Sequence, residues 1–151
     1  MEQKKSLIML PGPTNVPERV MRAMTKPIIG HRGPEFHDLH ESILNNLRYV
    51  FQTKNDVFVL TSSGTGGVYC AVGNIVNPND KVIIPVFGLF SERIRDKIVR
   101  CGGRTAELPL EWGEAPTADQ IARIVEREKD AKAIALVYNE TSTGVTARDL
   151  P

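Results

Sequence analysis

The feature that most constrains the fold is an alternation of short strand-like runs with helical segments, which begins after the first third of the chain. Four runs are predicted strands, most of them rich in Val, Ile and Leu: 57–61, 81–86, 104–108 and 133–138. Helices are predicted between them, at 64–76, 88–100 and 117–129. This alternation predicts an α/β fold, in which a mainly parallel sheet is flanked by helices in three layers.

The first part of the chain has a different pattern. Three prolines within residues 7–17 remove backbone donors and favour extended backbone, so residues 1–17 are predicted to form an extended arm. A short helix, 17–26, is expected next, because Pro17 suits a first helical turn. The predicted organisation is therefore an N-terminal arm followed by part of a larger domain, 18–151.

A longer helix is predicted from Pro34 to about Phe51. Its apolar side chains recur every three or four residues, which places them on one face that we expect to be buried: Phe36, Leu39, Ile43, Leu47 and Val50. On the same helix, His37 and His40 have a spacing that metal ligands use, but no third ligand accompanies them. A solvated or interface helix is the stronger interpretation.

Composition argues against several classes of partner. Lys and Arg total 19 against 18 for Asp and Glu, so there is no electrostatic reason to expect nucleic acid or an anionic membrane. No apolar run approaches the roughly 20 residues of a membrane-spanning helix, and the run before Pro11 is too short for a signal peptide. We expect a cytoplasmic protein, with Cys70 buried and Cys101 at a helix end rather than in a disulfide or zinc site.

The loop 62–67 follows a predicted strand and opens a predicted helix, and ligands bind at such strand ends in open α/β sheets. Its sequence, Ser-Ser-Gly-Thr-Gly-Gly, combines flexible backbone, hydroxyl groups and free helical N–H groups, which suits a phosphate dianion. A tight turn needed only for packing explains the same residues. The loop lacks the Lys of the ATP-binding P-loop, so ATP is disfavoured.

Two further loops follow predicted strands. Residues 86–91 include Phe87 and Phe90, which could support a flat ring, although core packing is the commoner role of a phenylalanine. Phe90 is the better candidate because Phe87 is nearer the strand. Residues 138–144 are rich in hydroxyl groups that could bind ligand oxygens or could simply form a capped turn.

Six short motifs, each weak alone, occur in a recognisable order along nearly the whole chain: 11–17, 30–32, 49–53, 63–66, 88–90 and 140–145. In this combination the chain resembles the class V aminotransferases of fold type I, in the branch of alanine–glyoxylate and serine–pyruvate aminotransferases. The resemblance implies that the α/β part is an incomplete large domain of that fold.

The resemblance also implies a cofactor, pyridoxal 5′-phosphate. Thr65, Gly66 and Gly67 would hold its phosphate, and Phe90 would stack on its pyridine ring, where many relatives carry Trp. Thr141 would form a hydrogen bond near its phenolic oxygen. Gly67 stands where relatives carry His, so the role of that side chain has no counterpart in this chain.

The implied reaction is transamination between a small amino acid, alanine or serine, and a small 2-oxo acid, glyoxylate or pyruvate. Gly12 and its neighbours would line the substrate entrance. The family's site lies at a subunit interface, so the resemblance implies a homodimer.

Three parts of the family's site have no counterpart in the sequence, so no catalytic residue is assigned. They are the Asp that pairs with the pyridine nitrogen, the Lys that forms an imine with the cofactor, and the Arg that binds the substrate carboxylate. The lysines present, such as Lys81, Lys97 and Lys132, are expected at strand starts or on helices away from the site.

The rest of the large domain and the small C-terminal domain also have no counterpart. We therefore expect this chain to work as part of a longer or split enzyme and to be inactive alone. The alternative is a non-catalytic phosphate-ligand-binding module or a degenerate aminotransferase fragment.

The missing lysine leads to a prediction about covalent chemistry. When the purified chain is mixed with pyridoxal phosphate and reduced with borohydride, no specific lysine should carry a pyridoxyl group, because imine exchange needs a dedicated amine. Peptide mass spectrometry after reduction checks this. A single modified lysine at high occupancy would contradict the prediction.

Overall fold

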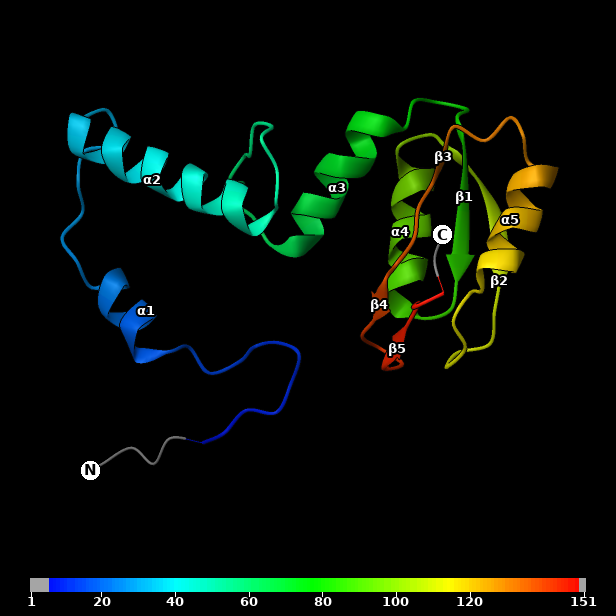
Figure 1. Ribbon diagram of the computed structural model, residues 1–151, viewed down its shortest axis with the longest axis horizontal. Helices are drawn as coiled ribbons and strands as arrows, with labels where there is room; N and C mark the ends of the chain where they lie inside the picture. The colour runs from blue at the N-terminus through cyan, green and yellow to red at the C-terminus, as the bar shows by residue number, and fades with distance from the viewer. Residues whose placement is uncertain (1–5, 150–151) are drawn as a thin grey trace. The chain divides into compact units, whose positions relative to one another are not determined.

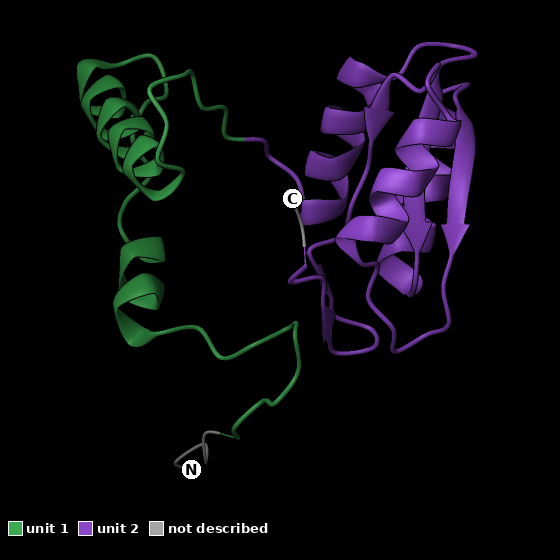
Figure 2. Ribbon diagram, turned by 45° about the vertical axis from the view of Figure 1, so that its right-hand side comes forward, with its two compact units in different colours: residues 1–59 green, residues 60–151 purple. Residues whose placement is uncertain are grey.

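The computed structural model describes residues 6–149 and divides into two compact units, Met1–Val59 and Leu60–Pro151 (Figure 2). The predicted arm, 1–17, contains neither helix nor strand among its described residues. The first unit holds two helices, α1 (Glu18–Met24) and α2 (Pro34–Val50), both close to their predicted bounds. Pro34 occupies the first turn of α2, where its missing N–H costs nothing.

The predicted burial of one face of α2 is wrong. None of its residues is buried, and the side chains of Leu39 and Val50 are 49% and 69% exposed. His40 stacks on Phe36 with ring centroids 5.9 Å apart, so its ring packs along the helix. The spacing of apolar residues identifies which face of a helix is apolar, but burial also requires a second surface packed against that face.

The second unit contains the sheet. Its strands are β1 (Lys81–Val86), β2 (Arg104–Pro109) and β3 (Ala133–Ile134), which are parallel and lie in the order β2-β1-β3. Its helices are α3 (Gly64–Ile75), α4 (Leu89–Arg100) and α5 (Ala118–Arg127). A separate antiparallel pair is formed by β4 (Asn139–Glu140) and β5 (Val145–Thr146). The predicted α/β class with a parallel sheet is confirmed.

The strand order explains why the helices cover both faces of this sheet. The chain moves from β1 to β2 through α4, then returns past β1 to β3 through α5. Because such crossovers are right-handed, opposite directions of travel place α4 and α5 on opposite faces (Figure 1). On the α3 and α4 side, the core consists of five buried residues: Val72, Val76, Val82, Ile84 and Ile98.

The strand predicted at 133–138 is confirmed only for its first two residues. In this ladder Lys132 and Ala135 donate from their N–H groups to the carbonyls of Lys81 and Ile83. By the alternation of a parallel ladder, the next residue of β1 to bond toward β3 is Pro85, which has no N–H. The ladder therefore stops where the proline begins, a constraint that lies on the neighbouring strand rather than in 133–138 itself.

Two other predictions from local pattern are wrong. Residues 57–61 form no strand, and the side chain of Phe58 is 81% exposed, since no neighbouring backbone pairs with this apolar run. Further along the chain, the turn of the β4–β5 hairpin includes Gly144 at φ 71°, a backbone conformation that suits glycine. Cys70 is exposed rather than buried, whereas Cys101 follows α4 as expected.

No helix in residues 6–149 is both long and apolar enough to cross a bilayer. At the amino ends of β1 and β3, charged side chains form two sets of ion pairs. Lys81 binds Asp130 at 2.6 Å and Glu128 at 3.0 Å, and Lys132 binds Asp80 at 2.6 Å. The predicted location of both lysines at strand starts is confirmed, and the pairs fix the segment before β3 to the start of β1.

These pairs predict an acid-dependent loss of stability. The hydrogen bond from Lys132 holds the pKa of Asp80 below its ordinary value of 3.8, and Lys81 lowers the pKa of both Glu128 and Asp130. Stabilisation from a carboxyl group with a lowered pKa is complete above its unfolded pKa and disappears as the pH falls through the folded value. Urea unfolding midpoints of the wild type should therefore fall in acid.

Lys132→Met should reduce that dependence by the share due to Asp80, whereas the exposed Lys129→Met is the matched control. The hydrogen bond to Asp130 is the main cause of the raised pKa of Lys81, which predicts a loss of stability in alkali. Its stabilisation is complete below the ordinary value of 10.5 and is lost as the pH rises through the raised value. Parallel pH curves for wild type and Lys132→Met would contradict the assignment.

Candidate functional site

The site begins with a buried carboxylate. Glu140, fully buried, accepts hydrogen bonds from the N–H groups of Phe90 and Ser91 at 3.2 and 2.9 Å. These groups belong to the first turn of α4, where backbone donors have no partner within the helix. A carboxylate at a helix N-terminus also interacts favourably with the helix dipole. Glu140 therefore fixes the direction in which α4 leaves the sheet.

Two serines complete this arrangement. The Ser142 hydroxyl accepts from the Leu89 N–H at 2.9 Å and donates to Glu140 at 2.6 Å. The buried Ser91 hydroxyl accepts from the Phe87 and Gly88 N–H groups, both at 3.0 Å, and donates to the Gly88 carbonyl at 2.7 Å. The segment after β3 and the start of α4 are thereby held as one piece.

The electrostatics agree with this geometry. Burial opposes ionisation of Glu140, but hydrogen bonds from Ser142, Ser91 and Phe90 outweigh it and hold the pKa of the carboxyl group below its ordinary value of 4.5. Gly88 has to be glycine here because Glu140 and Ser142 lie directly against its Cα. A Cβ at Gly88 would lie 2.7 Å from the Ser142 hydroxyl and closer still to Glu140.

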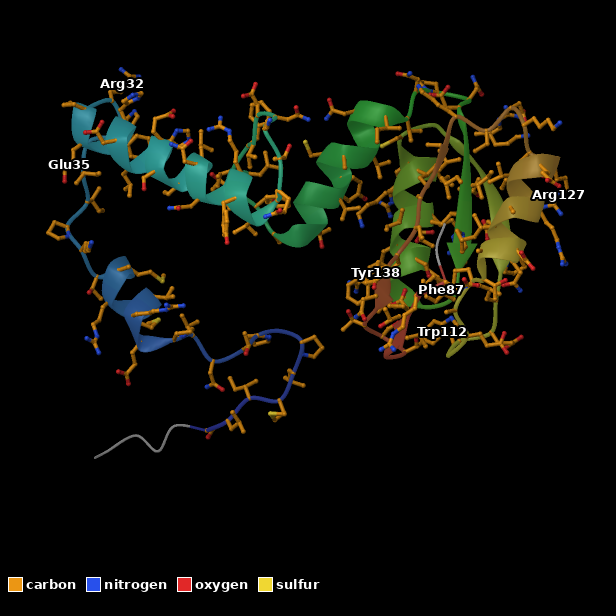
Figure 3. All side chains as sticks on the ribbon, in the orientation of Figure 1. Arg32, Glu35, Phe87, Trp112, Arg127 and Tyr138 are labelled. Atoms are coloured by element: carbon orange, nitrogen blue, oxygen red, sulfur yellow. The ribbon has the colours of Figure 1, made fainter. Side chains whose placement is uncertain are left out.

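A pocket of about 480 Å³ lies beside this junction, at the carboxyl ends of the strands where α/β proteins bind ligands. Phe87 directly follows the last residue of β1 and is seen near its carboxyl end (Figure 3). The pocket is lined by the start of α3, one face of α4 and the segment after β3: Gly64, Thr65, Val68, Phe90, Arg93, Ile94, Lys97, Val137, Asn139 and Thr141.

Three of the predicted cofactor residues, Thr65, Phe90 and Thr141, lie together in this pocket. Phe87 is fully buried in the core, whereas Phe90 is 40% exposed at the pocket wall, and its stacking on a cofactor ring stays a prediction. Glu140 and Ser142 are both bound to α4, and Thr141 lies between them. The pocket therefore brings together residues that are 76 positions apart in sequence, Thr65 and Thr141.

The remaining predicted residues are placed differently. Gly66 and Gly67 follow Thr65 in the first turn of α3 but are not among the lining residues of this pocket. The Gly67 N–H donates to the Ser63 carbonyl within the helix, and a Cβ at Gly66 would collide with the Ser62 side chain. Their contact with a phosphate stays a prediction. Gly12 belongs to the first unit, so its place at a substrate entrance also stays a prediction.

Sequence reasoning missed several residues of the site. Lys97 was expected away from it, yet Lys97 and Arg93 line the pocket. Arg93 is three residues and Lys97 seven residues after Phe90 on one helix, and this spacing is the signal that places all three side chains on one face. Glu140 was noted only as part of a motif. An acidic residue directly after a buried strand, beside a helix start, is the pattern that could have identified it as a cap.

Comparison with known proteins gives a consistent picture, although no family model matches the chain. An uncharacterized aminotransferase of Methanocaldococcus jannaschii is 41% identical over 140 residues, covering 93% of this chain and 36% of that protein. The L-aspartate–glyoxylate aminotransferase of Paracoccus denitrificans is 36% identical over 141 residues, covering 91% of this chain and 36% of its own length.

The crystal structure of an alanine–glyoxylate aminotransferase from Nostoc sp. superposes with a TM-score of 0.88 at 33% identity, covering 97% of this chain and 39% of that one. Over nearly its whole length, this chain is similar to the class V aminotransferases. It spans little more than a third of the length of the curated aminotransferases it matches. Its sheet and helices are part of the fold type I domain of that family.

The pocket of this chain suits a phosphorylated aromatic cofactor. Ser63 makes no side-chain cap at the start of α3, so the first-turn N–H groups are not bound by it. Apart from neighbouring residues of the chain and the backbone of α3 itself, nothing lies within 4 Å of the position that a Cβ would occupy at Gly64 or Gly67, which leaves room for a ligand close to the backbone. Phe90 offers a ring at the pocket wall, and Asn139 and Thr141 offer polar groups.

The buried Glu140 cap predicts a large effect of a small substitution. Glu140→Gln keeps the shape of the side chain but removes the negative charge. It also replaces one accepting oxygen with an amide nitrogen, which cannot accept a hydrogen bond from a backbone N–H. We expect a loss of about 1.5–3 kcal/mol in the free energy of unfolding, the usual range for a hydrogen bond to a charged group. Glu126→Gln, at an exposed position of α5, is the matched control for chemical denaturation. Equal stability of the two variants would show that Glu140 does not organise the junction.

Proposed function

We propose that this chain provides part of the pyridoxal-phosphate site of a transaminase. The observation that supports the proposal most directly is the presence of Thr65, Phe90 and Thr141 in one pocket beside the start of α3. Relatives that match more than nine tenths of this chain bear names such as L-aspartate–glyoxylate and serine–glyoxylate aminotransferase. A binding module without an enzymatic role is the competing interpretation, and it needs the same pocket.

The proposed reaction is amino-group transfer from alanine or serine to glyoxylate or pyruvate. Pyridoxal phosphate, when bound, supplies the carbonyl group that carries the amino group and a ring that takes up electrons. Thr65 and the free N–H groups of the first turn of α3 would hold its phosphate, with Gly66 and Gly67 in the same turn. Thr141 would donate its hydroxyl hydrogen near the phenolic oxygen of the ring.

Phe90 would hold the ring in orientation. Its position depends on the cap by Glu140 and Ser142, because both bind the first-turn backbone of α4 on either side of the Phe90 N–H. The chain would therefore bind and orient the cofactor, whereas the proton-transferring lysine would come from residues outside this sequence. A homodimer in the cytoplasm is part of the proposal, and sedimentation analysis and cell fractionation test these two points.

The activity is tested by assaying transfer from alanine or serine to glyoxylate or pyruvate. We expect no turnover with the chain alone, because no residue matches the family's lysine. The longest product translated from its reading frame, or a co-expressed partner, should restore turnover. If every preparation binds pyridoxal phosphate but none shows turnover, the result would support the binding module instead.

Thr65→Ala predicts weaker cofactor retention in the active preparation. The variant removes a hydroxyl that would bind the charged phosphate, which corresponds to roughly 1–3 kcal/mol of binding free energy. The dissociation constant is measured by absorbance titration, with Thr25→Ala in the first unit as a threonine control. Unchanged affinity for the cofactor would remove Thr65 from the proposed site.

A further inference from the structure

Lys97 is a buried cation whose partners are not anions. The residue is 6% exposed, its ammonium group lies 5.0 Å from the ring centroid of Tyr69, and it donates to the Arg93 carbonyl at 3.4 Å. In residues 6–149 no carboxylate lies within ion-pair distance of it. A ring face and a weak carbonyl contact replace only part of the hydration that the ammonium group loses.

Two lysines at the amino ends of the strands show the partners that an ammonium group ordinarily has. Lys81 binds two carboxylates, and Lys132 binds one, although the side chains of both are more exposed than Lys97. A buried charge without a counter-charge is strongly destabilising, whereas an anion placed beside it offsets that cost. An anion bound beside Lys97 would therefore offset the cost of burying its charge.

The surroundings of Lys97 show where that ligand would bind. Its side chain lines the pocket that contains Thr65 and Phe90, and also an adjoining hollow of about 400 Å³. The hollow is lined by three cations, one carboxylate and two hydroxyl groups: Arg93, Lys97, Arg100, Asp96, Thr65 and Tyr69. The carboxylate of Asp96 is bound by Arg95 at 3.1 Å, so it does not neutralise the others.

We propose that Lys97, assisted by Arg93, forms the cationic wall of a phosphate subsite next to the start of α3. The subsite takes a phosphate dianion, either inorganic phosphate or the phosphate group of the cofactor. Binding of the cofactor's phosphate group at this subsite rests on the proposed function. Arg93 lies on the same face of α4, with its guanidinium carbon 5.3 Å from the ring centroid of Phe90, so Arg93 adjoins the proposed ring position.

The subsite separates two tasks between two helices. The start of α3 offers neutral donors, namely N–H groups and the Thr65 hydroxyl, which fix the position of the phosphate oxygens. Lys97 supplies the charge from α4, held in place by the ring of Tyr69. In this proposal the Lys97 side chain binds the phosphate noncovalently, so it is a binding group and not a nucleophile.

The test uses isothermal titration calorimetry on the full chain in phosphate-free buffer. The probes are inorganic phosphate, pyridoxal phosphate and pyridoxal, which has the ring but no phosphate. Lys97→Met removes the charge and keeps an apolar side chain, whereas Lys97→Arg keeps the charge. The control is Lys129→Met, which removes one positive charge at an exposed position outside the pocket.

Lys97→Met should weaken binding of inorganic phosphate and pyridoxal phosphate by at least roughly ten-fold, the effect expected for a hydrogen bond between charged groups. Binding of pyridoxal should not change, Lys97→Arg should recover most of the affinity, and Lys129→Met should match the wild type. Without ligand, Lys97→Met should unfold at the same or a higher urea concentration than the wild type, because it removes a buried unpaired charge.

Four outcomes decide the matter. Weaker binding of both phosphate probes by Lys97→Met supports the subsite. If phosphate binds through Lys97 but pyridoxal phosphate binds no more tightly than phosphate, the subsite stands and the proposed function fails. Loss of affinity in Thr65→Ala but not in Lys97→Met overturns the subsite and leaves the proposed function intact. A borohydride-stable adduct on Lys97 also overturns it, because the amine would then react with the aldehyde.

Discussion

The buried carboxylate of Glu140 is the interaction on which the rest of the site depends. Its hydrogen bonds to the Phe90 and Ser91 N–H groups join residues about 50 positions apart in sequence, and Ser142 adds a third bond to the same helical turn. A fully buried charge is stable only when such donors surround it. Because those donors are the unpaired N–H groups of α4, one carboxylate caps the helix and fixes the pocket wall at once.

The pocket is then a consequence of topology. Three parallel strands in the order β2-β1-β3 bring their carboxyl ends to one edge, where the start of α4 meets the segment after β3. α3 packs on the same side of the sheet, and Val72 of α3 and Val76 directly after it belong to the core shared with α4. Neutral donors at the start of α3 and cations along α4 therefore adjoin one another without any local motif that contains both.

Local signals predicted the regular elements well and failed where a partner decides the outcome. α2, α5 and β1 lie within a few residues of their predicted ranges, because capping residues, prolines and apolar runs act over short distances. The strand at 133–138 is cut short by Pro85 on its neighbour, and the apolar runs at 57–61 and along α2 have no covering surface among the described residues of their own units. Pairing and burial are properties of two surfaces, so one segment cannot specify them.

The sequence by itself determined the chemistry of the loops: a Gly-rich turn with Thr65 before a helix, an aromatic residue after one strand and a hydroxyl-rich run after another. Their order along the chain was sufficient to indicate the family. Only the tertiary structure decided that Thr65, Phe90 and Thr141 share one pocket, that Glu140 holds that pocket together, and that Lys97 faces it. The reason is physical: these contacts join separate elements, and their geometry follows from how the helices pack on the sheet rather than from the residues beside them in the chain.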